Sequence, residues 1–220
     1  MNSRDKILDR LRKSTEEKSA SKQSDWSDKI LFSDYPLSRE QLLSEFKRHI
    51  ELLAGELHVF DSIETLAEAI PRLLHETAPD KCRSHHSELI DRIKSVNAAS
   101  AAYLTAIDKQ EIDSVSFADI EVGITAADYL VARTGSILLC ARSAGGRRLS
   151  VLPPTHLVIS TTSSLVFSLD EGLNHLRSDP QAGSYATFIT GPSRTSDIEK
   201  QLVLGAHGPK RLIILLLRTD

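Results

Sequence analysis

The sequence predicts an α/β fold, a mostly parallel β-sheet with helices on both faces, preceded by a charged N-terminal arm. Two patterns in the second half of the chain predict this fold. Its short apolar runs lack alternating polar residues, as do strands that are buried on both faces of a parallel sheet. Stretches with helical periodicity separate these runs, which is the order of elements in α/β proteins. The 220 residues suffice for one domain and an appendage.

Composition excludes several classes of protein. The chain is 40% hydrophobic, which excludes wholesale disorder, and its 2 cysteines cannot build a disulfide-dense secreted module. A net charge of −3 offers no electrostatic footprint for general nucleic-acid binding. The longest apolar run, Leu212–Leu217, is far shorter than the ~20 residues of a membrane-spanning helix, and no apolar secretory signal is visible. We therefore expect a cytoplasmic protein with no membrane span and no nucleic-acid partner.

Residues 1–38 form the predicted arm. Of the first 40 residues 17 are charged, and the helical stripe of Ile7, Leu8 and Leu11 has no continuation in the next turn. This segment is interpreted as a flexible or partner-docked arm, with a mobile solvated tail as the alternative. Residues 39–220 then form a single α/β domain.

The first helix of the domain is predicted over residues 39–54, between a suitable N-cap at Ser38 and a stop at Gly55. Its apolar stripe consists of Leu42, Leu43, Phe46, Ile50 and Leu53. Further helices are predicted over residues 63–78 (split or kinked at Pro71), 97–107, 125–134, 169–177 and 196–204. Strands are predicted over residues 57–60, 136–141, 156–161, 186–190 and 212–217.

Several motifs are absent from the sequence. It contains no P-loop, no dinucleotide fingerprint, no H-E-x-x-H and no nucleophile elbow. An iron–sulfur cluster needs about four thiolates, so the two cysteines cannot hold one alone, and Cys140 is expected to be a core residue of a strand. His85, His86 and Glu88 could contact a metal, but we expect a solvated polar turn there and no metal site.

Two segments share the spacing of a capping box, in which a hydroxyl residue stands three residues before a carboxylate. Thr125 precedes Asp128, and Ser196 precedes Glu199. Both carboxylates would then simply begin helices. In the functional alternative, the second segment follows a strand through a Gly-Pro turn and presents N–H groups and hydroxyls at the carboxyl end of that strand, where α/β sheets bind ligands. A carboxylate there would act as a base or orient the ligand.

Cations and two histidines suggest the kind of ligand. Between Ile120 and Ile159 the chain has four arginines and two acids, and arginine binds carboxylate or phosphate in a bidentate fashion. We therefore predict a small anionic ligand, with a solvated basic rim as the alternative. His156 opens a strand and His207 lies in a glycine-rich turn, where histidine can titrate near neutrality or bind the last carbonyls of a helix.

These patterns define the candidate site. The candidate catalytic residues are Asp128, Glu199, His156 and His207. The candidate ligand-binding residues are Thr125, Thr134, Gly135, Ser136, Arg147, Arg148, Gly191, Ser193, Thr195, Ser196 and Asp197.

Several motifs in order resemble one known family. They are Gly123-Ile124-Thr125-x-x-Asp128, Thr134-Gly135-Ser136, Arg148-Leu149-Ser150-x-Leu152-Pro153-Pro154-x-His156, Gly191-Pro192-Ser193-x-Thr195-Ser196-Asp197-Ile198-Glu199 and Gly205-x-His207-Gly208-Pro209. Dense over about residues 120–217, they resemble the LUD-domain family, the group of lactate-utilisation protein C. The resemblance implies a Rossmann-like fold similar to the sugar-phosphate isomerase and CoA-transferase superfamily. It also implies a role in oxidising L-lactate to pyruvate beside separate iron–sulfur subunits.

Three functions therefore stay open at this point. The first is a subunit of a lactate-oxidising complex, whose iron–sulfur clusters lie on partner subunits while this chain alone binds no cofactor. The second is a self-sufficient enzyme acting on a phosphorylated or CoA-linked small molecule. The third is a binding or regulatory module without chemistry.

Overall fold

The computed structural model describes residues 4, 6–9, 37–107, 117–140, 146–180, 182, 185–195, 203–204 and 207–219. Contacts divide the chain into two units, residues 1–36 and residues 37–220. In the first unit, residues 4 and 6–9 are helical, and Ile7 and Leu8 are exposed. Most of the predicted arm lies outside the described residues.

The second unit contains helices and strands in alternation. Its helices are α2 (Arg39–Leu52), α3 (Ile63–Leu73), α4 (Glu88–Val96), α5 (Ala98–Tyr103), α7 (Gly146–Leu149) and α8 (Leu169–Arg177), with 3-10 turns η1 (Pro79–Lys81) and η3 (Thr162–Ser164). Its strands are β1 (Glu56–Phe60), β2 (Cys82–Ser84), β3 (Val122–Ala126), β4 (Tyr129–Val131), β5 (Ser136–Cys140), β6 (Thr155–Thr161), β7 (Leu165–Val166), β8 (Ala186–Ile189), β9 (Arg194–Thr195), β10 (Val203–Leu204) and β11 (Arg211–Leu217).

The main sheet has five parallel strands in the order β1-β11-β6-β3-β2, which confirms the predicted α/β fold with a parallel sheet. Its three central strands are almost entirely buried, as their continuous apolar runs require. The strands predicted over residues 57–60, 156–161 and 212–217 are β1, β6 and β11.

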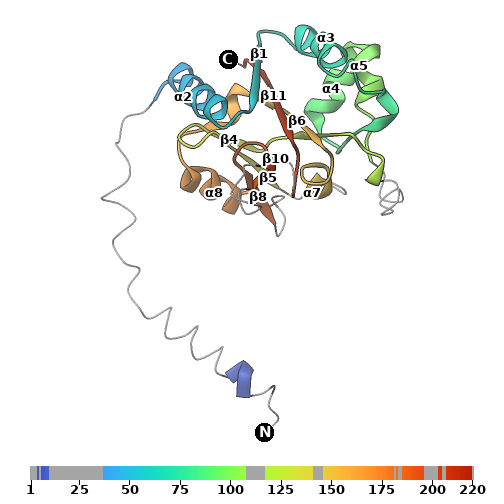
Figure 1. Ribbon diagram of the computed structural model, residues 1–220. Coiled ribbons are helices and arrows are strands. Elements are labelled where there is room, and N and C mark those ends of the chain that lie inside the picture. Colours follow the sequence, from blue (N-terminus) through green and yellow to red (C-terminus); the bar gives the residue numbers. More distant parts are fainter. Residues whose placement is uncertain are drawn as a thin grey trace. The chain divides into compact units, whose positions relative to one another are not determined.

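The two faces of this sheet are covered differently. On one face, side chains of β3, β6 and β11 pack against α3, α4 and α5. On the other face, the alternate side chains of β6 and β11 pack against α2 and a second sheet of order β7-β4-β5-β8. Figure 1 shows this arrangement, with α3, α4 and α5 together on one side of β11 and β6 and with β4, β5, β8 and α8 on the other. The expectation of helices on both faces is therefore only partly right, because a small sheet replaces most of one helical layer.

The prediction of a helix over residues 125–134 is wrong. Thr125 lies in β3, and residues 129–131 form β4, which pairs antiparallel with β5 and parallel with β7. This stretch contains β-branched residues that favour strands, and the spacing of Thr125 and Asp128 resembles a capping box by coincidence. β5 and β8 are also antiparallel to each other, although both were expected in a parallel sheet.

The prediction of a helix over residues 196–204 is wrong at its described end. Val203 and Leu204 form β10, which pairs antiparallel with β9. Residues 196–202 lie outside the described residues. Several described elements have no counterpart in the sequence prediction. They are the helices α4 and α7, the strands β2, β7 and β9, and the 3-10 turns η1 and η3.

Two predicted helices have informative ends. Ser38 caps α2 as predicted, in a capping box with Gln41, and Ala54 with a φ of 62° ends the turn that follows. The helix α3 continues past Pro71 and ends at Leu73, two residues later. Pro71 has no N–H to donate to the carbonyl of Ala67, four residues earlier. The fully buried Ser100 of α5 donates its hydroxyl to that carbonyl instead.

Candidate functional site

A small pocket lies where the main sheet, the small sheet and α7 meet. Seven residues line it: His85, Thr125, Leu139, Cys140, Arg147, Ser150 and Thr187. They come from the loop after β2, from β3, β5 and β8, and from α7 and the residue after it. Thr125 and Arg147 were predicted site residues, and the structure brings them to one pocket.

Thr125 and His156 form the base of this region. Thr125 Oγ1 and His156 Nε2 share a hydrogen bond of 2.8 Å, which joins neighbouring strands β3 and β6. His156 is fully buried, and its Nδ1 has no hydrogen-bond partner among the described residues. Burial lowers the pKa of His156 to about 3, with a further contribution from nearby His85. His156 is therefore neutral at physiological pH.

His85 forms the second wall. Its Nε2 accepts a hydrogen bond of 2.7 Å from the backbone N–H of Ala126, so Nε2 carries no proton in this geometry. Burial lowers the pKa of His85 to about 4, while the carboxylate of Asp128 opposes this shift and His86 adds to it. His86 and Glu88 are exposed, and the part of the chain described holds no group of three or more His, Cys, Asp or Glu that could bind a metal.

Gly123 allows α7 to close over the pocket. Gly123 lies on the same face of β3 as Thr125, beside His156 in the register of β6. A Cβ at Gly123 would collide with the carbonyl oxygen of Leu149, the last residue of α7. The absence of a side chain at this position thus lets α7 approach the sheet and present Arg147.

Arg147 is held at the open side of the pocket. Its guanidinium lies 3.7 Å from the centroid of the Tyr185 ring, close enough for a cation–π interaction. The pKa of Tyr185 is lowered, first by a hydrogen bond with Thr187 and also by Arg147. Arg148, the neighbouring predicted residue, is exposed and lies 5.3 Å from the ring of Phe117, so it does not line this pocket.

Asp128 has a role that differs from the predicted helix cap. It is half-buried between β3 and β4, and its Oδ2 accepts a hydrogen bond of 2.6 Å from the backbone N–H of Cys140 in β5. Its charge also acts on His85, which places it near the pocket without lining it. Cys140 is buried in β5, as the sequence predicts for a core cysteine.

Four predicted ligand residues gather at the opposite end of β5. Thr134 Oγ1 lies 2.7 Å from Ser136 Oγ, which lies 2.8 Å from Thr190 Oγ1. Gly135 and Gly191 have φ values of 62° and 90° and pack against the last turn of α2 and the residue after it. Ser136 is the first residue of β5 and Cys140 the last, roughly 13 Å apart at the usual rise of a strand. This cluster is therefore separate from the pocket at Thr125.

The other predicted residues are scattered. His207 is exposed in the turn before β11, where the neighbouring Gly208 packs against Ser193. Thr195 lies in β9, opposite Val203. Ser196, Asp197 and Glu199 lie outside the described residues.

Five of the seven pocket residues were not predicted as site residues: His85, Leu139, Cys140, Ser150 and Thr187. Leu139 and Cys140 lie in the apolar run of β5, where the sequence predicts core residues. His85 was assigned to a solvated turn, but it is 8% exposed. Ser150 stands inside the motif Arg148-Leu149-Ser150, which was the available signal. Thr187 carries no signal, because it is one hydroxyl in a short apolar strand.

Comparison with known proteins identifies the family to which this chain belongs. The profile of the LUD domain matches residues 43–217, from α2 to the last residue of β11. The chain belongs to the LUD domain family. All seven pocket residues lie inside the matched LUD region. The resemblance drawn from the sequence motifs is thereby confirmed.

Three relatives of this LUD chain share one name. A protein named Lactate utilization protein C from Geobacillus thermodenitrificans is 26% identical over 189 residues, which cover 83% of this chain and 72% of that protein. One of the same name from Halalkalibacterium halodurans is 30% identical over 157 residues, 68% of this chain and 67% of that protein. A third, from Shouchella clausii, is 38% identical over 104 residues, which is 46% of this chain and 44% of that protein.

One solved structure resembles the fold of this LUD chain. The crystal structure of a DUF162 family protein from Deinococcus radiodurans superposes with a TM-score of 0.61 and 22% identity. The match covers 83% of this chain and 99% of that one, and it shows the fold. Among the helices that the structure describes, none is long and apolar enough to cross a membrane.

Proposed function

We propose that this LUD protein is a cytoplasmic subunit of a system that oxidises L-lactate to pyruvate, together with separate iron–sulfur subunits, and that it binds a small anionic ligand. The observation that carries the proposal is the LUD match over residues 43–217, with relatives named Lactate utilization protein C. Arg147 and Thr125, two of the residues predicted to bind that ligand, line one small pocket, which supports this part of the proposal.

The cysteines of this chain support the proposal that partner subunits hold the iron–sulfur clusters. The sequence has only 2, and both are buried in strands. Burial, with the nearby carboxylate of Glu121, raises the pKa of Cys82 to about 12, which opposes formation of the thiolate that ligates iron. This chemistry favours clusters held by partner chains.

Deletion of the gene tests the physiological role. The strain should lack any second LUD gene, so that no redundant copy masks the effect. We expect loss of growth on L-lactate as sole carbon source, normal growth on glucose, and recovery when the gene is restored. Normal growth of the deleted strain on L-lactate would overturn the proposal.

Isolation from native cells tests the partners. The tagged full chain is purified from cells grown on L-lactate, and the co-eluting proteins are identified and assayed for iron and acid-labile sulfide. We expect cysteine-rich proteins in fixed proportion to the chain. Recovery of the chain alone, or with proteins that contain no iron, counts against this part of the proposal.

A further inference from the structure

We propose that the surface around α7 docks an acidic surface of the iron–sulfur partner subunit. This surface, the α7 face, consists of six exposed residues: Arg147, Arg148, Val151, Leu152, Pro154 and Lys210. The identity of the partner rests on the proposed function. The residues through which the two proteins meet come from the structure of this chain.

Backbone hydrogen bonds join the residues of the α7 face. Val151 and Leu152 follow α7, and their N–H groups donate to the carbonyl of Arg148 at 3.2 and 2.8 Å. Lys210 joins them from the turn before β11, because its N–H donates to the carbonyl of Pro154 at 2.8 Å. Segments about 60 residues apart in the sequence thus place cations and apolar side chains together.

The cations of the α7 face are available to a partner. The guanidinium of Arg147 lies 3.7 Å from the centroid of the Tyr185 ring, and that of Arg148 lies 5.3 Å from the centroid of the Phe117 ring. In the described part of the chain, neither arginine nor Lys210 forms an ion pair. A guanidinium that stacks on a ring keeps N–H groups that can bind carboxylates. A carboxylate-rich surface would therefore complement the α7 face.

The α7 face also presents two neighbouring apolar side chains. Val151 is 43% exposed and Leu152 is 57% exposed. Leu149 and Pro153, which stand before and after the pair, are buried and anchor it. Because residues that are already held in place lose little freedom on binding, this pair is well prepared for an interface.

The composition of the α7 face favours a protein over a membrane or a nucleic acid. Arginine is enriched at protein–protein interfaces, and the centres of these interfaces are apolar. Clusters that bind anionic lipids have about four to eight Lys or Arg residues, whereas the α7 face has three cations. The net charge of −3 opposes general binding to nucleic acid.

The affinity between the purified full chain and the iron-containing protein that co-elutes with it tests the inference. The informative variant is Arg148→Glu/Leu152→Ser, which changes two exposed residues outside the pocket. We expect its affinity for the partner to fall about 10-fold or more, as loss of important interface residues does. Higher salt should weaken binding of the unmodified chain, because salt screens charges.

A matched control is available on α4. Arg92→Glu/Val96→Ser makes the same kinds of change, since Arg92 is exposed and Val96 is 44% exposed. The helix α4 covers the other face of the main sheet, because Val122 and Ile124 pack on its side whereas Gly123 between them meets α7. This control should bind the partner as tightly as the unmodified chain does.

Lys210→Glu is a second variant, which leaves α7 and the residues after it unchanged. It should slow association with the partner more than it speeds dissociation, as changes of charge at the rim of an interface do. Thermal unfolding of each variant checks that it is folded before its affinity is compared.

Four results would overturn the assignment of the α7 face. The first is full affinity in both Arg148→Glu/Leu152→Ser and Lys210→Glu, and the second is equal weakening by the α4 control. The third is binding that does not change with salt. The fourth is that the purified chain alone binds phosphatidylserine vesicles or self-associates through Arg148 and Leu152, because a membrane or a second copy would then occupy this face.

Failure of the proposed function gives different results. If the deletion strain grows normally on L-lactate while the iron-containing partner binds through the α7 face, only the proposed function is overturned. If the deletion strain does not grow and the partner binds Arg148→Glu/Leu152→Ser and Lys210→Glu at full affinity, only the α7 face is overturned. If no iron-containing protein co-elutes with the unmodified chain, both are overturned.

Discussion

Thr125 and His156 are joined by a hydrogen bond of 2.8 Å inside the protein, between the two strands that carry the base of the pocket. Neither residue is more than 1% exposed, so water does not replace this bond easily. Thr125→Val should therefore leave the His156 ring without its partner and lower the free energy of unfolding by about 1–3 kcal/mol.

Thr125→Ser is the matched variant, since it retains the hydroxyl and removes one methyl group. Thr125→Ser should lower the free energy of unfolding by less than Thr125→Val does. Urea unfolding at pH 7 measures both. Equal stability of Thr125→Val and the unmodified protein would mean that the hydrogen bond contributes nothing net to folding.

Acid should destabilise the protein before its carboxylates titrate. Burial lowers the pKa of His85 to about 4 and that of His156 to about 3, whereas in the unfolded chain both are near 6.5. Below pH 6.5 the unfolded chain therefore binds more protons than the folded one. The stability due to these neutral histidines is complete above pH 6.5 and falls as the pH drops toward 4.

Urea unfolding between pH 7.5 and 4.5 checks this dependence. His85→Gln is the informative variant, because its amide oxygen can still accept from Ala126 but does not titrate. Its stability should decline less steeply between pH 6.5 and 5. An unchanged slope would show that His85 is protonated about equally in both states.

Ser100 and Pro71 should be energetically coupled. Ser100 donates to the Ala67 carbonyl, which Pro71 leaves without its helical donor. Ser100→Ala should lower the free energy of unfolding by about 1–3 kcal/mol, because it leaves a buried carbonyl unpaired. In a Pro71→Ala background the restored N–H can bind this carbonyl, so Ser100→Ala should lower the free energy of unfolding by less. A double-mutant cycle measures the coupling, and a coupling energy of zero would contradict this account.

Gly123→Ala should separate α7 from the sheet. The new methyl group would meet the carbonyl of Leu149, whose side chain is fully buried and cannot shift freely. We expect the free energy of unfolding to fall by at least about 1–3 kcal/mol. Thermal unfolding measures this loss. An unchanged Tm would show that α7 is not held by this contact.

The ion pair between Glu56 and Arg211 should contribute little, despite its good geometry. The two distances are 2.6 and 2.8 Å, but both side chains are about 40% exposed. Hydrogen bonds from Arg211 lower the pKa of Glu56, so the contribution is lost as the pH falls through that lowered value. Glu56→Gln should cost less than about 1 kcal/mol at pH 7, and less again in high salt. Urea unfolding measures this difference. A larger loss of unfolding free energy that does not change with salt would show that solvent does not screen this ion pair.

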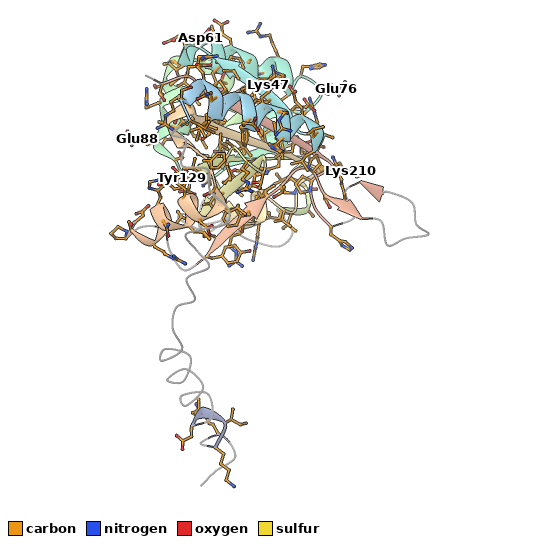
Figure 2. The ribbon with its side chains drawn as sticks, turned by 90° about the vertical axis from the view of Figure 1, so that its left-hand side faces the viewer. Lys47, Asp61, Glu76, Glu88, Tyr129 and Lys210 are labelled. Carbon is orange, nitrogen blue, oxygen red and sulfur yellow. The ribbon has the colours of Figure 1, made fainter. Side chains whose placement is uncertain are left out.

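Charged side chains lie at the ends of two helices that cover one face of the main sheet. Asp61, Glu76 and Glu88 lie around the ends of α3 and α4, and Figure 2 shows them above Tyr129, which belongs to the small sheet.

Part of the fold could be predicted from local sequence patterns. The helices α2 and α8 could be predicted because apolar residues recur at helical spacing between capping residues. The strands β6 and β11 could be predicted because their apolar runs are continuous.

Other features could not be predicted from local patterns. The Thr125–Asp128 spacing fits a helix cap, but Thr125 is paired along β3 and Asp128 binds the backbone of β5. The apolar runs of β5 and β8 resemble those of parallel strands, yet they pair antiparallel with each other. Strand direction depends on the partner strand, which a run of residues does not specify.

The sequence by itself determined the family, the parallel α/β sheet and the residue types available for an anionic ligand. Only the tertiary structure decided which of them meet. It placed Arg147 and Thr125 in one pocket with His85, and it moved Thr134 and Gly191 to a separate cluster at the other end of β5. The physical reason is that secondary structure follows from contacts a few residues apart, whereas this pocket forms where two sheets pack together.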